Sequence, residues 1–177
     1  MVPEARLKPT DRGLVPQGEG WYVLNAREAA WLGNDELSTF CHFEGDVGWR
    51  QLGLNVCVVE PGHPNCMYHD EPNQEGYLIL SGEAIVIVEG EERRVQAWDY
   101  VHLPPWTDHV LIGTGDGPCV FVAVGARSDD GGAYRANPVA QKHGAAVDED
   151  TPDPAEAYAR FSLIAPRRCP EGVLPDR

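Results

Sequence analysis

Two histidines and two glutamates in the middle of the chain have the types and spacing of a metal-binding site. His69 is followed by Glu71, and alternate residues of a β-strand lie on the same face. Glu75 comes just before an apolar run, and His109 follows the proline turn at 104–108. Two imidazoles and carboxylates bind divalent ions and leave positions open for dioxygen or a substrate. We therefore predict that these four residues hold a divalent metal ion.

Other side chains near these four are candidates for proton transfer or for the pocket wall. Tyr77 has the same strand parity as Glu75, so it either lines the pocket and donates its hydroxyl or is a core aromatic. Glu71, where it does not bind metal, is a second candidate for moving protons. Trp106, on the turn before His109, either forms the rim of the pocket or caps the barrel end. Cys66 lies an odd number of residues from His69, which predicts the opposite strand face and excludes it as a zinc ligand.

The elements that must position these residues are short β-strands. Apolar runs of four to nine residues are separated by glycine, proline and acidic turns. Gly90, between two of these runs, favours a tight hairpin. Strands this short, with no helices between them, predict an all-β sandwich or closed barrel. The predicted strands are 52–60, 66–69, 76–80, 84–88, 93–96, 100–103, 109–112 and 119–125.

The N-terminal flank differs from this β-rich region. Residues 1–20 are rich in proline, glycine and charge, which predicts an extended arm. Asn25 and Glu28 have the spacing of a capping box, so we predict a short helix at 26–32 that stops at Gly33.

The C-terminal flank contains a second helix signal and a proline-containing tail. Asp153, a proline and Glu156 match an N-cap, N1 and N3, which predicts a helix running to about Phe161. Residues 165–177 are expected to form a loosely attached tail. The predicted domains are 1–51, an N-terminal arm and short helix packing on the barrel; 52–126, the barrel core; and 127–177, a C-terminal extension with a short helix.

Composition limits the partners and the compartment. The chain has 28 acidic and 14 basic residues, a net charge of −14, which repels nucleic acid and anionic membranes. Five cysteines without paired spacing indicate reduced thiols, with Cys57 and Cys119 in the core. No apolar run reaches eighteen residues, and no signal peptide is visible at residues 1–13. We therefore expect a cytoplasmic protein that binds a small molecule, with neither nucleic acid nor membrane as a partner.

The segment with the candidate metal ligands resembles the two-motif signature of the cupin superfamily. The first motif corresponds to Gly62, His69-x-Glu71, Glu75 and Gly82. The second motif corresponds to Trp98-Asp99, Pro104-Pro105-Trp106 and His109. The resemblance covers about residues 52–125, and both motifs match in spacing.

The resemblance implies a single jelly-roll β-barrel with short flanking helices, and His69, Glu75 and His109 as metal ligands. Glu71 stands at the place of the motif's second histidine; as a ligand it would complete a set of two histidines and two glutamates, which favours Mn, Fe or Zn over Cu. The alternative is a degenerate cupin without an ion. Trp98 and Trp106 replace glycines, so we expect those turns to lack the positive φ of glycine turns. Gly113 stands where an asparagine is frequent.

Three functions are compatible with this pattern. The leading hypothesis is a metal-dependent enzyme, dioxygenase-like, acting on a small polar or carbonyl-bearing molecule, with Tyr77 or Glu71 as the proton carrier. One alternative is a cupin that binds a small ligand without turnover, as a sensor or storage module. The other is a metal-free isomerase or epimerase. Pairing through an exposed barrel edge predicts a homodimer.

Overall fold

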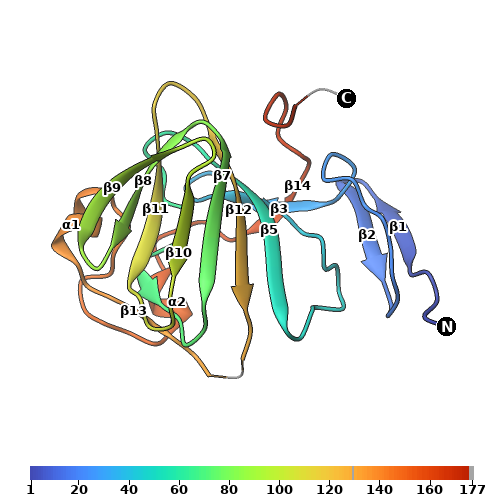
Figure 1. Cartoon of the computed structure of the whole chain (residues 1–177), viewed down its shortest axis with the longest axis horizontal. Helices are drawn as coiled ribbons and strands as arrows, with labels where there is room; N and C mark the ends of the chain where they lie inside the picture. The colour runs from blue at the N-terminus through green and yellow to red at the C-terminus, as the bar shows by residue number, and fades with distance from the viewer. Residues whose placement is uncertain (129, 176–177) are drawn as a thin grey trace.

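The computed structural model describes residues 1–128 and 130–175, so positions 129, 176 and 177 of the predicted C-terminal extension lie outside it. Within these ranges the strands form one seven-stranded sheet, one five-stranded sheet and an N-terminal hairpin (Figure 1). All strand pairs are antiparallel. The predicted all-β class is therefore confirmed.

The larger sheet supplies one wall of the barrel. Its order is β10 (Tyr100–Leu103), β7 (Glu75–Ser81), β12 (Cys119–Ala126), β5 (Leu52–Val59), β4 (Thr39–Cys41), β3 (Trp31–Gly33) and β14 (Ala165–Arg167). β3, β4 and β14 come from the two flanks of the chain. Segments far apart in the sequence thus complete this sheet.

The smaller sheet supplies the opposite wall. Its order is β13 (Ala133–Tyr134), β6 (His69–Asp70), β11 (His109–Thr114), β8 (Glu83–Val88) and β9 (Glu91–Gln96). The predicted hairpin is confirmed, since β8 and β9 pair around Glu89 and Gly90, which have φ of 50° and 75°. Positive φ at both central residues matches the twist of the strands.

The main core lies between the two sheets and follows the alternation of strand side chains. In β7, Tyr77 and Ile79 are buried in it, as expected for residues two apart on one face. Cys57 and Cys119 belong to the same core, and all five cysteines are free. The prediction that these two cysteines are small core residues is confirmed.

The N-terminal flank departs from the prediction. Residues 26–32 form a turn followed by β3 instead of a helix. The Asn25 side chain accepts from the Arg27 amide, as in a cap, but the amide of Ala30 then donates to Leu14 at 3.0 Å. Pairing with distant strands therefore replaces the helical hydrogen bonds after one turn. The expected extended arm contains a hairpin, β1 (Arg6–Thr10) and β2 (Gly13–Gln17), which lies at one end of the molecule (Figure 1).

The C-terminal flank is more ordered than predicted. Asp153 caps α2 (Pro154–Ala157) through its side chain, as expected, but the helix ends before Tyr158 instead of near Phe161. A second short helix, α1 (Pro138–Lys142), was not predicted. β14 pairs with β3, so the start of the predicted loose tail is part of the larger sheet. None of the helices in the described part of the chain has the length and apolar character needed to cross a membrane.

The expectation that Trp98 and Trp106 lack positive φ is wrong. Their φ values are 76° and 64°, so each tryptophan adopts the glycine conformation. At the first of these turns the Trp98 amide donates to Ile79 at 2.8 Å, and the Asp99 amide donates to Gln96 at 3.0 Å. These hydrogen bonds hold the left-handed backbone even though a side chain disfavours it.

We expect Trp98→Gly to raise the free energy of unfolding by about 0.5–1 kcal/mol. Left-handed backbone costs an L-residue about 1–2 kcal/mol, and glycine loses about 0.5–1 kcal/mol of chain entropy on folding. The side chain is 76% exposed, so little packing is lost. Urea denaturation measures the change. Trp98→Ala is the control, because it removes the same side chain and keeps the Cβ atom; an equal gain in both variants would contradict this explanation.

Candidate metal centre

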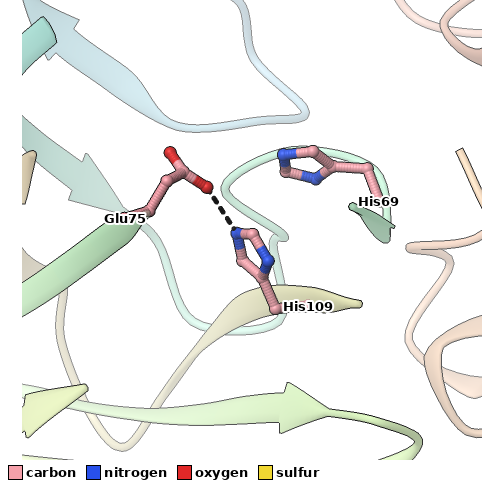
Figure 2. Close-up of side chains that lie close together, drawn as sticks. All are labelled: His69, Glu75 and His109. Atoms are coloured by element: carbon pink, nitrogen blue, oxygen red, sulfur yellow. Dashed lines mark ion pairs between the residues drawn. The ribbon is translucent and has the colours of Figure 1, made fainter. Parts of the chain in front are cut away.

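His69, Glu75 and His109 converge at one end of the barrel interior. One ligand atom of each residue lies within 4.8 Å of the others. Figure 2 shows the carboxylate of Glu75 directed at His109, with the His69 ring beside them. Glu75 comes from β7 of the larger sheet, and the two histidines come from β6 and β11 of the smaller sheet. The cluster is therefore assembled across the two walls of the barrel.

Strand register brings the two histidines together. His69 and His109 are direct partners in the pairing of β6 with β11, and their ring centroids are 4.6 Å apart. Directly opposed residues of an antiparallel pair place their side chains on the same face. The forty residues that separate the histidines in sequence do not separate them in the fold.

Both imidazoles are oriented in the same way by the backbone. The Nδ1 of His69 lies 2.8 Å from the carbonyl oxygen of Met67, and the Nδ1 of His109 lies 2.8 Å from that of Thr107. A carbonyl oxygen only accepts, so each Nδ1 carries a proton and each Nε2 faces the interior. Metal-binding histidines are typically fixed by such a hydrogen bond on the other nitrogen.

The Glu75 carboxylate has an acceptor atom without a hydrogen bond. Its side chain is 17% exposed, and Oε2 lies 3.0 Å from the Nε2 of His109. The contact lies outside hydrogen-bond geometry, and Oε2 is buried without a hydrogen-bond partner. Leaving a buried carboxylate oxygen unpaired is costly. A divalent cation beside this oxygen and the two Nε2 atoms would remove that cost, so the three residues fit a metal ion.

Tyr77 lies at the inner end of the cluster. Its hydroxyl is 2.9 Å from the Nε2 of His109, and its ring packs against the His109 ring with centroids 5.7 Å apart. Burial raises the pKa of Tyr77 well above its ordinary value. The hydroxyl therefore stays protonated, and without an ion it donates to Nε2; an ion bound at Nε2 would take that lone pair and leave the hydroxyl as a donor facing the centre. Tyr77 therefore lies in the core, as one prediction had it, and also contacts the candidate ligand His109.

Glu71 lies at the outer side of the cluster. Its Oε1 is 3.6 Å from the Nε2 of His69, and its side chain is 41% exposed. The contact with His69 lowers the pKa of the Glu71 carboxyl. Its backbone carbonyl accepts from the Trp106 amide at 2.7 Å. Glu71 is not in the group of three residues whose ligand atoms converge. It lies next to the candidate ion position, and its lowered pKa keeps its carboxyl group ionised.

The protonation of His69 depends on its surroundings. Burial lowers the pKa of His69, but contacts with Cys66, Glu71 and Glu75 outweigh it and raise the pKa well above its ordinary value. These contacts favour the form of His69 that carries protons on both ring nitrogens. The proton on Nε2 would leave when this nitrogen accepts a cation as ligand.

The odd spacing of Cys66 and His69 predicted that their side chains lie on opposite strand faces. The structure contradicts this prediction. The Sγ of Cys66 is 3.6 Å from the Nδ1 of His69, because β6 contains only His69–Asp70 and the preceding residues do not follow strand alternation. The sulfur contacts Nδ1 and not the inward-facing Nε2. Cys66 is thus a neighbour of the candidate centre outside the group of three converging ligands.

Two of the three candidate ligands, His69 and Glu75, line a cavity of about 350 Å³, and His109 is not among its lining residues. This size is at the lower end of small-molecule sites. Three residues of the C-terminal flank line the cavity, namely Tyr134, Tyr158 and Ile164. Sequence reasoning missed them because nothing local links these positions to a barrel that ends near residue 125. The remaining lining residues are Leu37, Ser38, Phe40, Asn55, Cys57, Asn65, Cys66, His69, Glu71, Glu75, Tyr77 and Ala123.

Other predicted positions lie away from the cavity. Trp106 is 57% exposed and does not line it, although its amide holds Glu71. His102 is an exposed residue of β10. Position 113 has room only for glycine, since a Cβ atom there would lie 2.3 Å from the carbonyl oxygen of Glu60.

A buried ion pair attaches the C-terminal flank beside His69. Asp70, which is 4% exposed, accepts from the Ala133 amide at 2.7 Å and from the Arg135 Nε at 3.1 Å. The same segment pairs Tyr134 with His69 across β13 and β6. Asp70 therefore fixes the tyrosine wall of the cavity relative to the candidate metal ligands.

Comparison with known proteins gives the family of one part of the chain. Residues 55–125 match the family model described as the cupin domain. This match identifies residues 55–125 as a cupin domain, in agreement with the antiparallel two-sheet arrangement of the strands. No curated protein matches the chain significantly.

Two solved structures support the fold. A predicted oxalate decarboxylase from Thermotoga maritima aligns with a TM-score of 0.53 at 18% identity, over 60% of this chain and 100% of that chain. The polyketide cyclase RemF from Streptomyces resistomycificus aligns with a TM-score of 0.52 at 14% identity, over 60% and 79%. At these identities the similarity concerns the fold alone.

A third solved structure is a sugar phosphate isomerase of the cupin superfamily from Silicibacter pomeroyi. It aligns with a TM-score of 0.49 at 22% identity, over 56% of this chain and 65% of that chain. This chain therefore spans less than two thirds of the length of that isomerase.

We expect Asp70→Ala to lower the free energy of unfolding by about 3 kcal/mol, because it leaves the Arg135 guanidinium and a backbone amide without their buried partner. Arg135 has two further carboxylates nearby, Asp108 at 3.8 Å and Asp150 at 3.2 Å. The control is Asp150→Ala; the Asp150 side chain is 53% exposed, so its loss should cost less than about 1 kcal/mol. Denaturant titration compares the two; equal losses would contradict the role given to Asp70.

Proposed function

We propose that this protein is a metal-dependent cupin enzyme that acts on a small carbonyl-bearing molecule, with dioxygenase-like chemistry. The observation that carries the proposal is the unpaired Oε2 of Glu75, buried beside two histidines whose Nε2 atoms face the same point. His69, Glu75 and His109 would hold the ion. Two histidines and one carboxylate suit Fe, Mn or Zn. When bound, the ion supplies Lewis acidity and open positions for substrate or dioxygen.

Glu71 and Tyr77 divide the handling of protons in this mechanism. Glu71 is ionised, lies beside His69 and is partly open to solvent, so it can accept a proton from a substrate hydroxyl. Tyr77 keeps its proton at the buried end, 2.9 Å from the Nε2 of His109; with the ion on Nε2, this hydroxyl would be free to donate a hydrogen bond to a substrate oxygen. A substrate in the cavity thus lies between a proton acceptor at the outer side and a hydrogen-bond donor at the inner side.

The two alternatives make different use of the same cavity. A ligand-binding cupin without turnover needs the cavity and the ion, but no proton carrier. A metal-free isomerase needs a histidine base backed by a carboxylate, whereas the Nδ1 of His69 and that of His109 each face a backbone carbonyl. The metal and turnover experiments below separate these functions.

Protein purified without chelator should contain close to one transition-metal ion per chain, measured by plasma mass spectrometry. His69→Ala and His109→Ala should each lose most of it, because each removes one of three ligands. His102→Ala is the matched control, since this histidine is exposed on β10, and it should keep the metal. A folded wild type free of metal, also after incubation with Fe²⁺, Mn²⁺ and Zn²⁺, would contradict the proposal.

Metal-loaded wild type should consume oxygen with at least one member of a panel of small hydroxy-carbonyl compounds, followed with an oxygen electrode. Tyr77→Phe should lower turnover about 100-fold at unchanged metal content, because a preorganised hydrogen-bond donor to developing charge contributes about 10²–10³-fold. Tyr100→Phe, at an exposed tyrosine of β10, should leave turnover unchanged. Ligand binding without oxygen consumption or product would favour the binding-only alternative.

A further inference from the structure

The cavity beside the candidate metal centre has an aromatic wall. Phe40, Tyr77, Tyr134 and Tyr158 line it together with aliphatic side chains. The rings of Tyr134 and Tyr158 meet edge to face, with centroids 5.3 Å apart and an interplanar angle of 86°. The Tyr158 hydroxyl accepts from the Met67 amide at 3.2 Å, which fixes this ring. Such a surface binds a flat, apolar body through edge and face contacts.

Two polar side chains on the rest of the wall, Ser38 and Asn65, make hydrogen bonds within the protein. The Ser38 hydroxyl donates to the Asn65 carbonyl at 2.9 Å, and the Oδ1 of Asn65 accepts from the Leu111 amide at 2.8 Å.

Asn55 is engaged in the same way. In the orientation that satisfies its neighbours, its amide nitrogen donates to the carbonyl oxygens of Cys41 and Leu54, at 3.1 and 3.2 Å. A polyol would bury hydroxyls here with few partners, which is costly. The groups left for a ligand are those at the metal end.

The charge on the cavity is unfavourable for anions. Among the described lining residues there are two carboxylates, Glu71 and Glu75, and neither lysine nor arginine. Arg127 acts on Glu71 from a distance, but its guanidinium is held by both carboxylate oxygens of Glu44 at 2.7 Å.

The second nearby arginine is also occupied, since Arg135 is paired with Asp70 and Asp150. The charge of a divalent ion is offset by the two glutamates, and the net charge of −14 further repels anions. An anionic ligand would therefore meet no unpaired positive side chain.

We propose that the cavity takes an uncharged molecule with a ring-sized apolar body and its oxygen atoms at one end, and that Glu71 excludes anionic analogues. The inference deepens the proposed function, because the oxygen atoms would lie at the metal end formed by His69, Glu75 and His109. Phosphorylated sugars and small dicarboxylates do not have this chemistry.

Two matched pairs of ligands test the proposal on the full Mn²⁺-loaded chain by titration calorimetry. 2′-Hydroxyacetophenone and salicylate share a ring and an ortho hydroxyl, but salicylate is an anion. 2′-Hydroxyacetophenone and acetylacetone share the two chelating oxygens, but acetylacetone has no ring. We expect the hydroxyketone to bind at least tenfold tighter than either partner. Equal or tighter binding of salicylate would overturn the charge argument, and equal binding of acetylacetone the ring argument.

The Glu71→Gln variant assigns the selectivity to its carboxylate. The ratio of hydroxyketone to salicylate affinity should fall at least tenfold in Glu71→Gln, mainly because salicylate gains affinity. Glu83→Gln, which removes an exposed carboxylate of β8 outside this cavity, should leave the ratio unchanged. An unchanged ratio in both variants would overturn the role of Glu71.

Failure of the proposed function is distinguished by the metal content, measured on the same samples. If the chain takes up no metal, the same three ligands are titrated into the metal-free protein. Preference for the hydroxyketone there would support the inference although the metal-dependent function fails. A metal-loaded chain that prefers salicylate would leave the proposed function standing and overturn the inference.

Discussion

The contact between the buried Glu75 carboxylate and the paired imidazoles of His69 and His109 is the interaction on which the site depends. Glu75 belongs to one sheet and both histidines to the other, so the contact exists only when the two sheets pack face to face. An ionised carboxylate with an unpaired oxygen is costly inside a barrel. A cation at this point would therefore stabilise the closed barrel as well as form the centre, since a ligand that binds only the folded chain favours it.

Local patterns predicted the parts of the fold that are decided locally. Seven of the eight predicted strands correspond to β5 and β7–β12, whereas the predicted strand 66–69 overlaps β6 only at His69. Gly90 marked the hairpin between β8 and β9. What the sequence did not reveal depends on long-range pairing. β14 pairs with β3 across more than 130 positions, and Tyr134 meets His69 through a two-residue strand. Neither segment has an apolar alternation long enough to be recognised.

Two predicted helices differ from the structure for the same physical reason: the one at 26–32 does not form, and the one after Asp153 ends early. In both places the cap is present, but the following amides or side chains find partners elsewhere. Trp31 is fully buried on β3, and Tyr158 turns into the cavity at the end of α2. Burial of a large aromatic side chain stabilises more than one additional helical turn does.

The charge of Glu71 affects both the candidate metal centre and the kind of ligand that the cavity wall can bind. A neutral histidine at this position would leave a divalent ion balanced by one carboxylate, and the residual positive charge would attract an anionic ligand. With Glu71 ionised beside His69, two carboxylates offset the ion and that attraction disappears. The neighbouring arginines are held by Glu44, Asp70 and Asp150, so neither of them replaces that attraction. Binding must then come from apolar contact, and the tyrosines that the C-terminal flank brings to the cavity supply it.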